Sequence, residues 1–123
     1  MIISTDQAPA AIGPYSQAVV HGDLLFCSGQ ISLLPSGEGP IGDNATEQAE
    51  QIMKNIAAVL AAGGSSFEKV IKTTIFLLDM GDFAAVNEVY GRHFPQNPPA
   101  RSTVAVSALP KGAKVEIEVI AAR

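Results

Sequence analysis

The sequence predicts an α+β fold, in which one mixed β-sheet carries two helices on one face. Two segments repeat their apolar residues at the three- and four-residue spacing of a helix. Shorter segments rich in β-branched residues are typical of strands. The order along the chain is strands, helix, strand, helix, strands. Two helices can cover only one face, so we expect the other face to meet solvent or another subunit.

The first part of the chain is expected to hold three short strands. Residues 1–4 form a candidate edge strand, and two prolines and a glycine within residues 8–15 predict a loop. Residues 21–23 have the composition of a tight turn. The segments on either side of this turn, 16–20 and 24–28, are therefore predicted to pair as a hairpin.

The first helix is predicted to follow Asn44. Asparagine is a favoured N-cap residue, and Glu47 three residues later completes a capping pair. The apolar residues behind this cap recur at spacings of three and four and so share one helical face. They are Ala49, Ile52, Met53, Ile56, Val59 and Leu60. Gly63-Gly64 is expected to stop the helix.

The second half of the chain is predicted to contain a strand, a helix and two more strands. Residues 70–78 are rich in β-branched side chains and are expected to form a central strand. A second helix is predicted to begin within residues 79–82, to place Phe83, Val86, Tyr90 and Phe94 on one face, and to end at Pro95. The last two strands are expected over 103–107 and 114–122. We expect them to pair as a hairpin with Ser107 opposite Lys114 and Ala105 opposite Glu116.

This hairpin would gather three charged residues and a threonine on one side of the sheet, namely Arg101, Glu116, Glu118 and Thr103. Arginine can bind a carboxylate through two parallel N–H bonds, and a nearby carboxylate can position or deprotonate a water. The pair is the minimum equipment for hydrolysing a small organic acid. The structural alternative is a solvated strand face, and the geometry does not choose between Glu116 and Glu118.

The composition predicts one soluble domain over residues 1–123. Apolar residues make up 47% of the chain, which is enough for a core, and a domain of this length should bury roughly two-thirds of its unfolded surface. The net charge is −4 and Lys and Arg form no cluster, so no nucleic-acid partner is expected. The single cysteine, Cys27, suits a reducing compartment. No signal peptide or membrane-length apolar run of roughly 20 residues is evident, so we expect a cytoplasmic location and no membrane partner.

Four motifs, in order along the chain, resemble those of the RidA/YjgF family, also called the reactive-intermediate deaminases. The similarity covers essentially the whole length. The motifs are AAIGPYSQA at 10–18, CSGQI at 27–31, DFAAVN at 82–87, and PARS at 99–102 followed by LP at 109–110 and VEI at 115–117.

The resemblance implies a chorismate-mutase-like fold that assembles as a homotrimer, with the open sheet faces inward and the sites in clefts between subunits. It implies hydrolysis of 2-imino acids to 2-oxo acids and ammonia. The substrates are imine or enamine products such as 2-aminoacrylate, 2-iminopropanoate and 2-iminobutanoate. Neither a metal nor an organic cofactor is implied.

The resemblance also assigns roles to site residues. Arg101 would bind the substrate carboxylate, and Glu116, preferred to Glu118 on this resemblance alone, would activate the attacking water. Thr103 stands where the family often has cysteine, and its backbone would bond the imino nitrogen.

The remaining implied site residues are less distinctive. Tyr15 would line the pocket, although a loop tyrosine packed on the core is an equal alternative. Ser28 and Gly29 would supply a small wall and backbone N–H groups, and Asn87 would hydrogen-bond across the cleft. An ordinary strand end and an exposed helix asparagine are their structural alternatives.

Two other functions remain as alternatives. One is a ligand-binding regulatory or chaperone-like trimer, and the other is a translation inhibitor or endoribonuclease. Arg101 is the hallmark of the deaminase-competent relatives, whereas the acidic balance argues against RNA binding.

Overall fold

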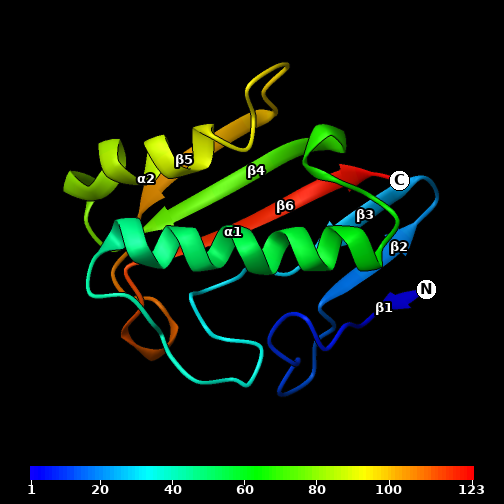
Figure 1. Cartoon of the computed structure of the whole chain (residues 1–123), viewed down its shortest axis with the longest axis horizontal. Coiled ribbons are helices and arrows are strands. Elements are labelled where there is room, and N and C mark those ends of the chain that lie inside the picture. Colours follow the sequence, from blue (N-terminus) through cyan, green and yellow to red (C-terminus); the bar gives the residue numbers. More distant parts are fainter.

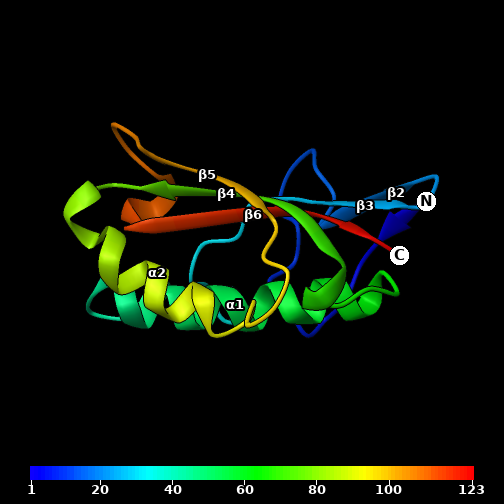
Figure 2. The same ribbon diagram turned by 90° about the horizontal axis from the view of Figure 1, so that it is seen from above.

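The computed structural model describes residues 1–123 as two layers, a six-stranded sheet and two helices on one of its faces (Figures 1 and 2). The sheet order is β1-β2-β3-β6-β4-β5. Only β4 and β5 pair in parallel. The strands are β1 Ile2–Ile3, β2 Ala18–His21, β3 Leu24–Cys27, β4 Val70–Leu77, β5 Ala100–Ala105 and β6 Val115–Ala122. The predicted α+β class is confirmed.

Helix α1, Ala45–Ala62, begins at the predicted cap. The Asn44 side chain accepts a hydrogen bond from the Glu47 N–H at 2.9 Å. The Glu47 carboxylate accepts from the Asp43 N–H at 3.1 Å, which satisfies a second free donor at the helix start. The helix ends at Gly63, where Arg123 Nε donates to the Gly63 carbonyl at 2.9 Å. A cation at this end stabilises the helix dipole.

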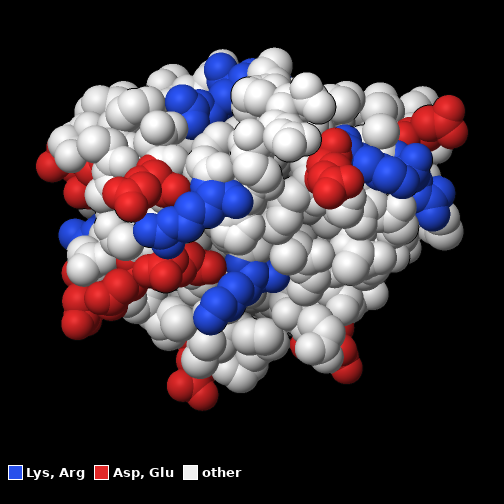
Figure 3. Space-filling view, turned by 45° about the horizontal axis from the view of Figure 1, so that its top comes forward, with Lys and Arg blue, Asp and Glu red and all other residues white.

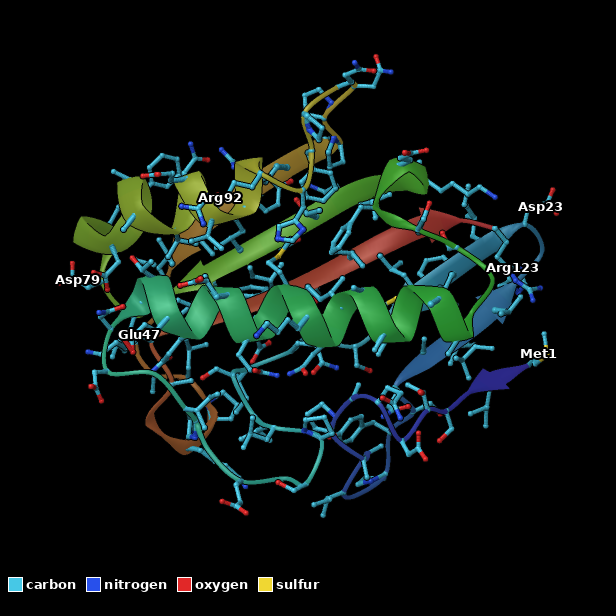
Figure 4. The ribbon with its side chains drawn as sticks, in the orientation of Figure 1. Met1, Asp23, Glu47, Asp79, Arg92 and Arg123 are labelled. Atoms are coloured by element: carbon cyan, nitrogen blue, oxygen red, sulfur yellow. The ribbon has the colours of Figure 1, made fainter.

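The side-chain view places the two ends of α1 clearly (Figure 4). Glu47 lies at the first turn of α1, and Arg123 lies at the opposite end beside Asp23. The Arg123 N–H donates to the Asp23 carbonyl at 2.9 Å. The C-terminal residue therefore ties α1 to the β2–β3 turn.

Helix α2, Phe83–Gly91, starts later and ends earlier than predicted. The residues before it form a short 3-10 turn, Met80–Asp82, because the Asp79 side chain accepts from the Gly81 N–H at 2.8 Å. Pro95 lies four residues beyond the helix end. Pro95 therefore prevents the helix from continuing past it, but it does not determine where the helix ends.

The core fills the space between the helices and the sheet. The predicted α1 face is buried there, with Ile52 and Leu60 fully inaccessible. From the sheet, Ile75 of β4 and Ile117 of β6 pack against the same cluster. Burying each such side chain contributes about 1.5–3 kcal/mol to stability. The predicted alternation of β6 is confirmed, since Val115, Ile117, Val119 and Ala121 face this core.

The predicted hairpin of the last two strands is wrong. β5 pairs in parallel with β4, and β6 lies on the other edge of β4, so β4 separates them. The cause is that α2 connects β4 to β5 as a β–α–β crossover, which places β5 parallel to β4. The partner of Ala105 is Leu77 instead of Glu116.

The face of the sheet opposite the helices exposes large apolar side chains. Ile2 of β1, Val19 of β2, Phe26 of β3 and Val104 of β5 belong to this face by register and are 41–69% exposed. The buried strand predicted over 24–28 is accordingly buried on one face only. No helix has the length and apolar character that crossing a membrane requires.

Candidate active site

Glu116 lies on the open face of β6, with its carboxylate against Gly29. A Cβ atom built on Gly29 would lie 2.5 Å from Glu116 Oε2, so any larger residue at position 29 would require the Glu116 carboxylate to move. Gly29 is held there because the next residue, Gln30, bridges to β6. The Gln30 N–H donates to the Ile117 carbonyl at 2.9 Å, and the Ile117 N–H donates back at 3.1 Å. The strand-end motif of the sequence thus places backbone beside Glu116.

A cavity of about 520 Å³ opens at this point, and we call it the glutamate cavity. Its walls come from residues 9–17, 28–33 and 110–111, together with Glu116. Four predicted site residues line it: Tyr15, Ser28, Gly29 and Glu116. Glu118 does not line it and is exposed. The sequence geometry did not choose between the two glutamates, and the structure places only Glu116 in the cavity.

Hydrogen bonds around Gln17 fix the wall that carries Tyr15. The Gln17 side chain is buried, accepts from the Thr5 N–H at 2.7 Å and donates to the Pro9 carbonyl at 2.7 Å. Ser28 Oγ donates to the Ser16 carbonyl at 2.6 Å. Tyr15 itself is 54% exposed, so the alternative of a ring packed in the core is wrong. Gln17 had no predicted role, and only its place inside a motif could have indicated one.

Only one of the two expected backbone donors, the N–H groups of Ser28 and Gly29, is free to bind a ligand. The Ser28 N–H donates to the Gln17 carbonyl at 2.9 Å and is therefore occupied. The Gly29 N–H donates to no acceptor within the protein. Gly29 is exposed, so its N–H is open to solvent and available as a donor to a ligand beside the Glu116 carboxylate.

The Glu116 carboxyl is half-buried, and this burial is the main cause that raises its pKa. The neighbouring Glu118 carboxylate raises the pKa of Glu116 further, because two like charges disfavour ionisation. A carboxyl shifted towards neutral pH is suited to accepting and returning a proton.

A second group of polar residues surrounds Arg101, on the helix side of β5. The Arg101 Nη1 group donates to Asn87 Oδ1 at 2.6 Å. The guanidinium also lies over the rings of Tyr90, at 5.0 Å, and Phe83, at 5.5 Å. Thr103, two residues further along β5, shares this face, and its hydroxyl oxygen is buried without a partner.

The two groups lie on opposite faces of one sheet, so the prediction that they share a side is wrong. Arg101 is paired with Thr73, whose side chain is in the core. Glu116 is paired with Phe76, three residues later on β4 and therefore on the other face. The expectation depended on a direct β5–β6 hairpin, and the intervening β4 changes which residues share a face.

The sequence also missed the close neighbours of Arg101 and a lysine at the glutamate cavity. Phe83 and Tyr90 were predicted only as an apolar helix face, and the expected partner of Asn87 lay across a cleft. Lys111 lines the cavity with a left-handed φ of 56°. Its one sequence signal is the Pro-Lys-Gly turn that holds it.

The protein is therefore an α+β protein with one mixed sheet. The residues around Glu116 lie on the open face of this sheet, and those around Arg101 lie on its helix side. The chain belongs to the family described as Endoribonuclease L-PSP, whose model matches residues 5–123. This is the family that the four sequence motifs resemble, because its curated members include the reactive-intermediate and 2-imino acid deaminases.

Individual relatives are similar over nearly the whole chain. Protein DfrA from Myxococcus xanthus is 58% identical over 97% of this chain and 92% of its own. The mouse 2-iminobutanoate/2-iminopropanoate deaminase is 48% identical over 98% of this chain and 89% of its own. The crystal structure of E. coli TdcF with bound serine matches with a TM-score of 0.93 and 45% identity, over 100% of this chain and 98% of that one.

Proposed function

We propose that this protein hydrolyses reactive 2-imino acids and their enamine tautomers to 2-oxo acids and ammonia. The substrates are 2-aminoacrylate, 2-iminopropanoate and 2-iminobutanoate. The observation that carries the proposal is the half-buried Glu116 carboxyl, set in a cavity beside the unpaired Gly29 N–H. The names of the mouse, rat and human relatives, each 47–48% identical, support the same substrate class.

The chemistry asks little of the protein, since an imine is already electrophilic. Glu116 accepts a proton from water as the water oxygen bonds to C2 of the imine. The same proton then passes to the nitrogen, which gives a carbinolamine. Glu116 next takes the hydroxyl proton and delivers it to the amine nitrogen, so that the C2–N bond breaks and ammonia leaves as the C2=O bond forms. Proximity and orientation supply most of the acceleration, and no metal or organic cofactor takes part in this scheme.

Arg101 binds the substrate carboxylate in this proposal. Its guanidinium has no carboxylate partner within the chain, because the only ion pair joins Arg92 to Glu88 at 3.3 Å. The Thr103 backbone bonds the imino nitrogen, and Tyr15, Ser28 and Gly29 enclose the ligand. TdcF, crystallised with serine, is a relative that binds a compound whose carboxylate and amine are attached to the same carbon.

In a homotrimer with sites between subunits, one ligand contacts both Arg101 and Glu116. Arg101 and Glu116 lie on opposite faces of one chain, so a small ligand reaches both only if a second copy supplies one of them. The exposed apolar face of the sheet supports self-association, since such faces usually mark interaction surfaces. The three-fold symmetry comes from the family resemblance.

Nucleic-acid and membrane partners are not part of the proposal. On the face that Figure 3 shows, Lys and Arg lie among Asp and Glu and form no continuous basic patch. Together with a net charge of −4, this argues against the endoribonuclease alternative. A cytoplasmic location is part of the proposal, and the single cysteine suits a reducing compartment.

The test is release of 2-oxo acid and ammonia from 2-aminoacrylate generated in situ, corrected for the uncatalysed rate. We expect acceleration by the wild type and none by Arg101→Ala, which stays folded because its side chain is exposed. Arg92→Ala is the matched control, since that arginine is paired with Glu88 on the surface. No acceleration by the wild type would leave a binding or regulatory role, and full activity of Arg101→Ala would contradict the carboxylate role.

A further inference from the structure

Three side chains of α2 surround the guanidinium of Arg101, and we call them the arginine cradle. Phe83, Asn87 and Tyr90 stand at positions i, i+4 and i+7, so they share one face of the helix. This helix lies beneath β4 and β5 (Figure 2). Asn87 accepts a hydrogen bond at 2.6 Å, and both ring centroids lie within the range of roughly 6 Å for a cation–π contact.

The arginine cradle does not neutralise the charge that it holds. None of its three side chains is ionised at neutral pH, and no Asp or Glu forms an ion pair with Arg101. The guanidinium has five N–H donors, of which the protein uses one, on Nη1. The remaining donors and the full positive charge are free for a ligand.

The Tyr90 ring is fixed by its own contacts. Its hydroxyl oxygen lies 2.8 Å from Thr73 Oγ1, in the buried layer between α2 and β4. Its ring packs against Phe94 at 4.6 Å, and Phe94 packs edge-on against Phe67 at 5.5 Å. The Tyr90 ring on which Arg101 rests is therefore packed into the core.

We propose that Phe83, Asn87 and Tyr90 are positioning residues, which hold Arg101 in place while leaving its charge uncompensated for a carboxylate. Asn87 determines the preference of Arg101 for a carboxylate ligand, because a neutral acceptor holds the guanidinium without compensating its charge. The inference rests on the proposed role of Arg101 in binding a carboxylate and does not depend on turnover.

A carboxylate at position 87 tests the importance of neutrality directly. Asp has the shape of Asn, so Asn87→Asp keeps the contact with Arg101 and adds one negative charge. The resulting charge-assisted bond, often bidentate, would compete with the ligand carboxylate for the same donors. Asn87→Ala removes the acceptor without adding a competitor, so it loosens the arginine and does not block it.

The experiment is calorimetric titration of 2-oxobutanoate, a stable carboxylate, into the whole protein. We expect Asn87→Asp to weaken binding at least about tenfold, as a charge-assisted pair replaces a neutral one. Asn87→Ala should weaken it only a few-fold. Ala85→Asp is the matched control, because it adds the same charge at an exposed position of α2. Thermal unfolding of each variant checks that the fold is unchanged.

A second pair of variants tests the aromatic part of the arginine cradle. Tyr90→Phe keeps the ring but removes the hydroxyl that contacts Thr73, so it should weaken binding less than Phe83→Leu, which removes a ring at a half-buried position and should weaken binding a few-fold. In the deaminase assay, the Phe83→Leu loss should appear mainly in KM, because carboxylate binding is affected before the proton transfer at Glu116.

The results separate this inference from the proposed function. Unchanged affinity in Asn87→Asp, or equal weakening by Ala85→Asp, would overturn the arginine cradle. If the wild type binds 2-oxobutanoate through Arg101 but does not accelerate imine hydrolysis, the deaminase proposal fails and the arginine cradle stands.

Discussion

Glu116 and Gly29 lie in direct contact, such that a Cβ atom on Gly29 would be 2.5 Å from one carboxylate oxygen and 3.0 Å from the carboxyl carbon. A side chain at position 29 would therefore force the Glu116 carboxylate to move. Gly29 has no left-handed φ, so backbone strain is not the reason for the glycine. The reason is close approach of the loop after β3 to the candidate proton acceptor.

Gly29→Ala should therefore displace the Glu116 carboxylate while leaving the fold intact. A shift of about 1 Å in a reacting group can lower a rate by roughly a hundredfold, and we expect kcat/KM to fall by about ten- to a hundredfold. Gly91→Ala is the matched control, since a Cβ there meets no atom within 4 Å and its φ is ordinary. Wild-type kinetics in Gly29→Ala would mean that the position of Glu116 is unimportant.

The pH dependence should report the interaction between Glu116 and Glu118. If Glu116 acts as a base, activity falls as the pH falls through its pKa. The Glu118 charge helps to raise that pKa, so Glu118→Gln should move the acidic limb of the kcat/KM profile to lower pH. The measurement is the profile from pH 4 to 8, with the remote surface variant Glu50→Gln as control. An unmoved limb would show that the titrating group is not Glu116.

The same pKa shift has a consequence for stability. A carboxyl whose pKa is raised by folding binds more protons in the folded than in the unfolded chain, within the window between its two pKa values. Stability therefore falls as the pH rises through this window. Glu116→Gln should unfold at a higher temperature than the wild type at pH 7, with the difference vanishing near pH 4. Equal unfolding temperatures of the wild type and Glu116→Gln at pH 7 would contradict the idea that burial of the Glu116 carboxylate destabilises the fold.

The helices could be predicted from the sequence because their signals are local. Asn44 and Glu47 lie three residues apart, and their capping bonds form within a single turn. The inward face of β6 follows from alternation alone. Each of these features depends on neighbours in the chain, so a pattern of residue types is sufficient to find it.

The relation between Arg101 and Glu116 could not be predicted in this way. Alternation gives the two faces of each strand, but which faces coincide depends on the order of strands in the sheet. That order is decided by the crossover through α2, which places β5 on the far edge of β4. For the same reason, Tyr90 was predicted on the apolar face of its helix but not as a contact of Arg101.

Thr103 provides a test of the claim that its backbone, and not its side chain, is used. Its hydroxyl oxygen is buried without a partner, and an unsatisfied buried polar group costs about 1–3 kcal/mol. Thr103→Val has the same shape and removes that group, so it should unfold at an equal or slightly higher temperature and keep its deaminase activity. A large loss of kcat without loss of stability would assign the hydroxyl a role in the reaction.

Mixing two inactive variants tests whether Arg101 and Glu116 of one site come from different copies. Arg101→Ala and Glu116→Gln should each be inactive alone. If neighbouring copies share a site, a hybrid contains some interfaces at which an intact arginine meets an intact glutamate. After random exchange of equal amounts in a closed ring, about one interface in four has this combination, so about a quarter of the wild-type activity should return.

The recovered activity supports a shared site only if the two variants have formed hybrid assemblies. Differently tagged variants, mixed under conditions that allow subunit exchange and then purified through both tags, give hybrids without either parent. Activity in this fraction, and none in the parents, requires that one ligand contacts two chains. An inactive hybrid fraction would place both residues of a site on one chain. The opposite faces occupied by Arg101 and Glu116 make that outcome incompatible with a single small ligand.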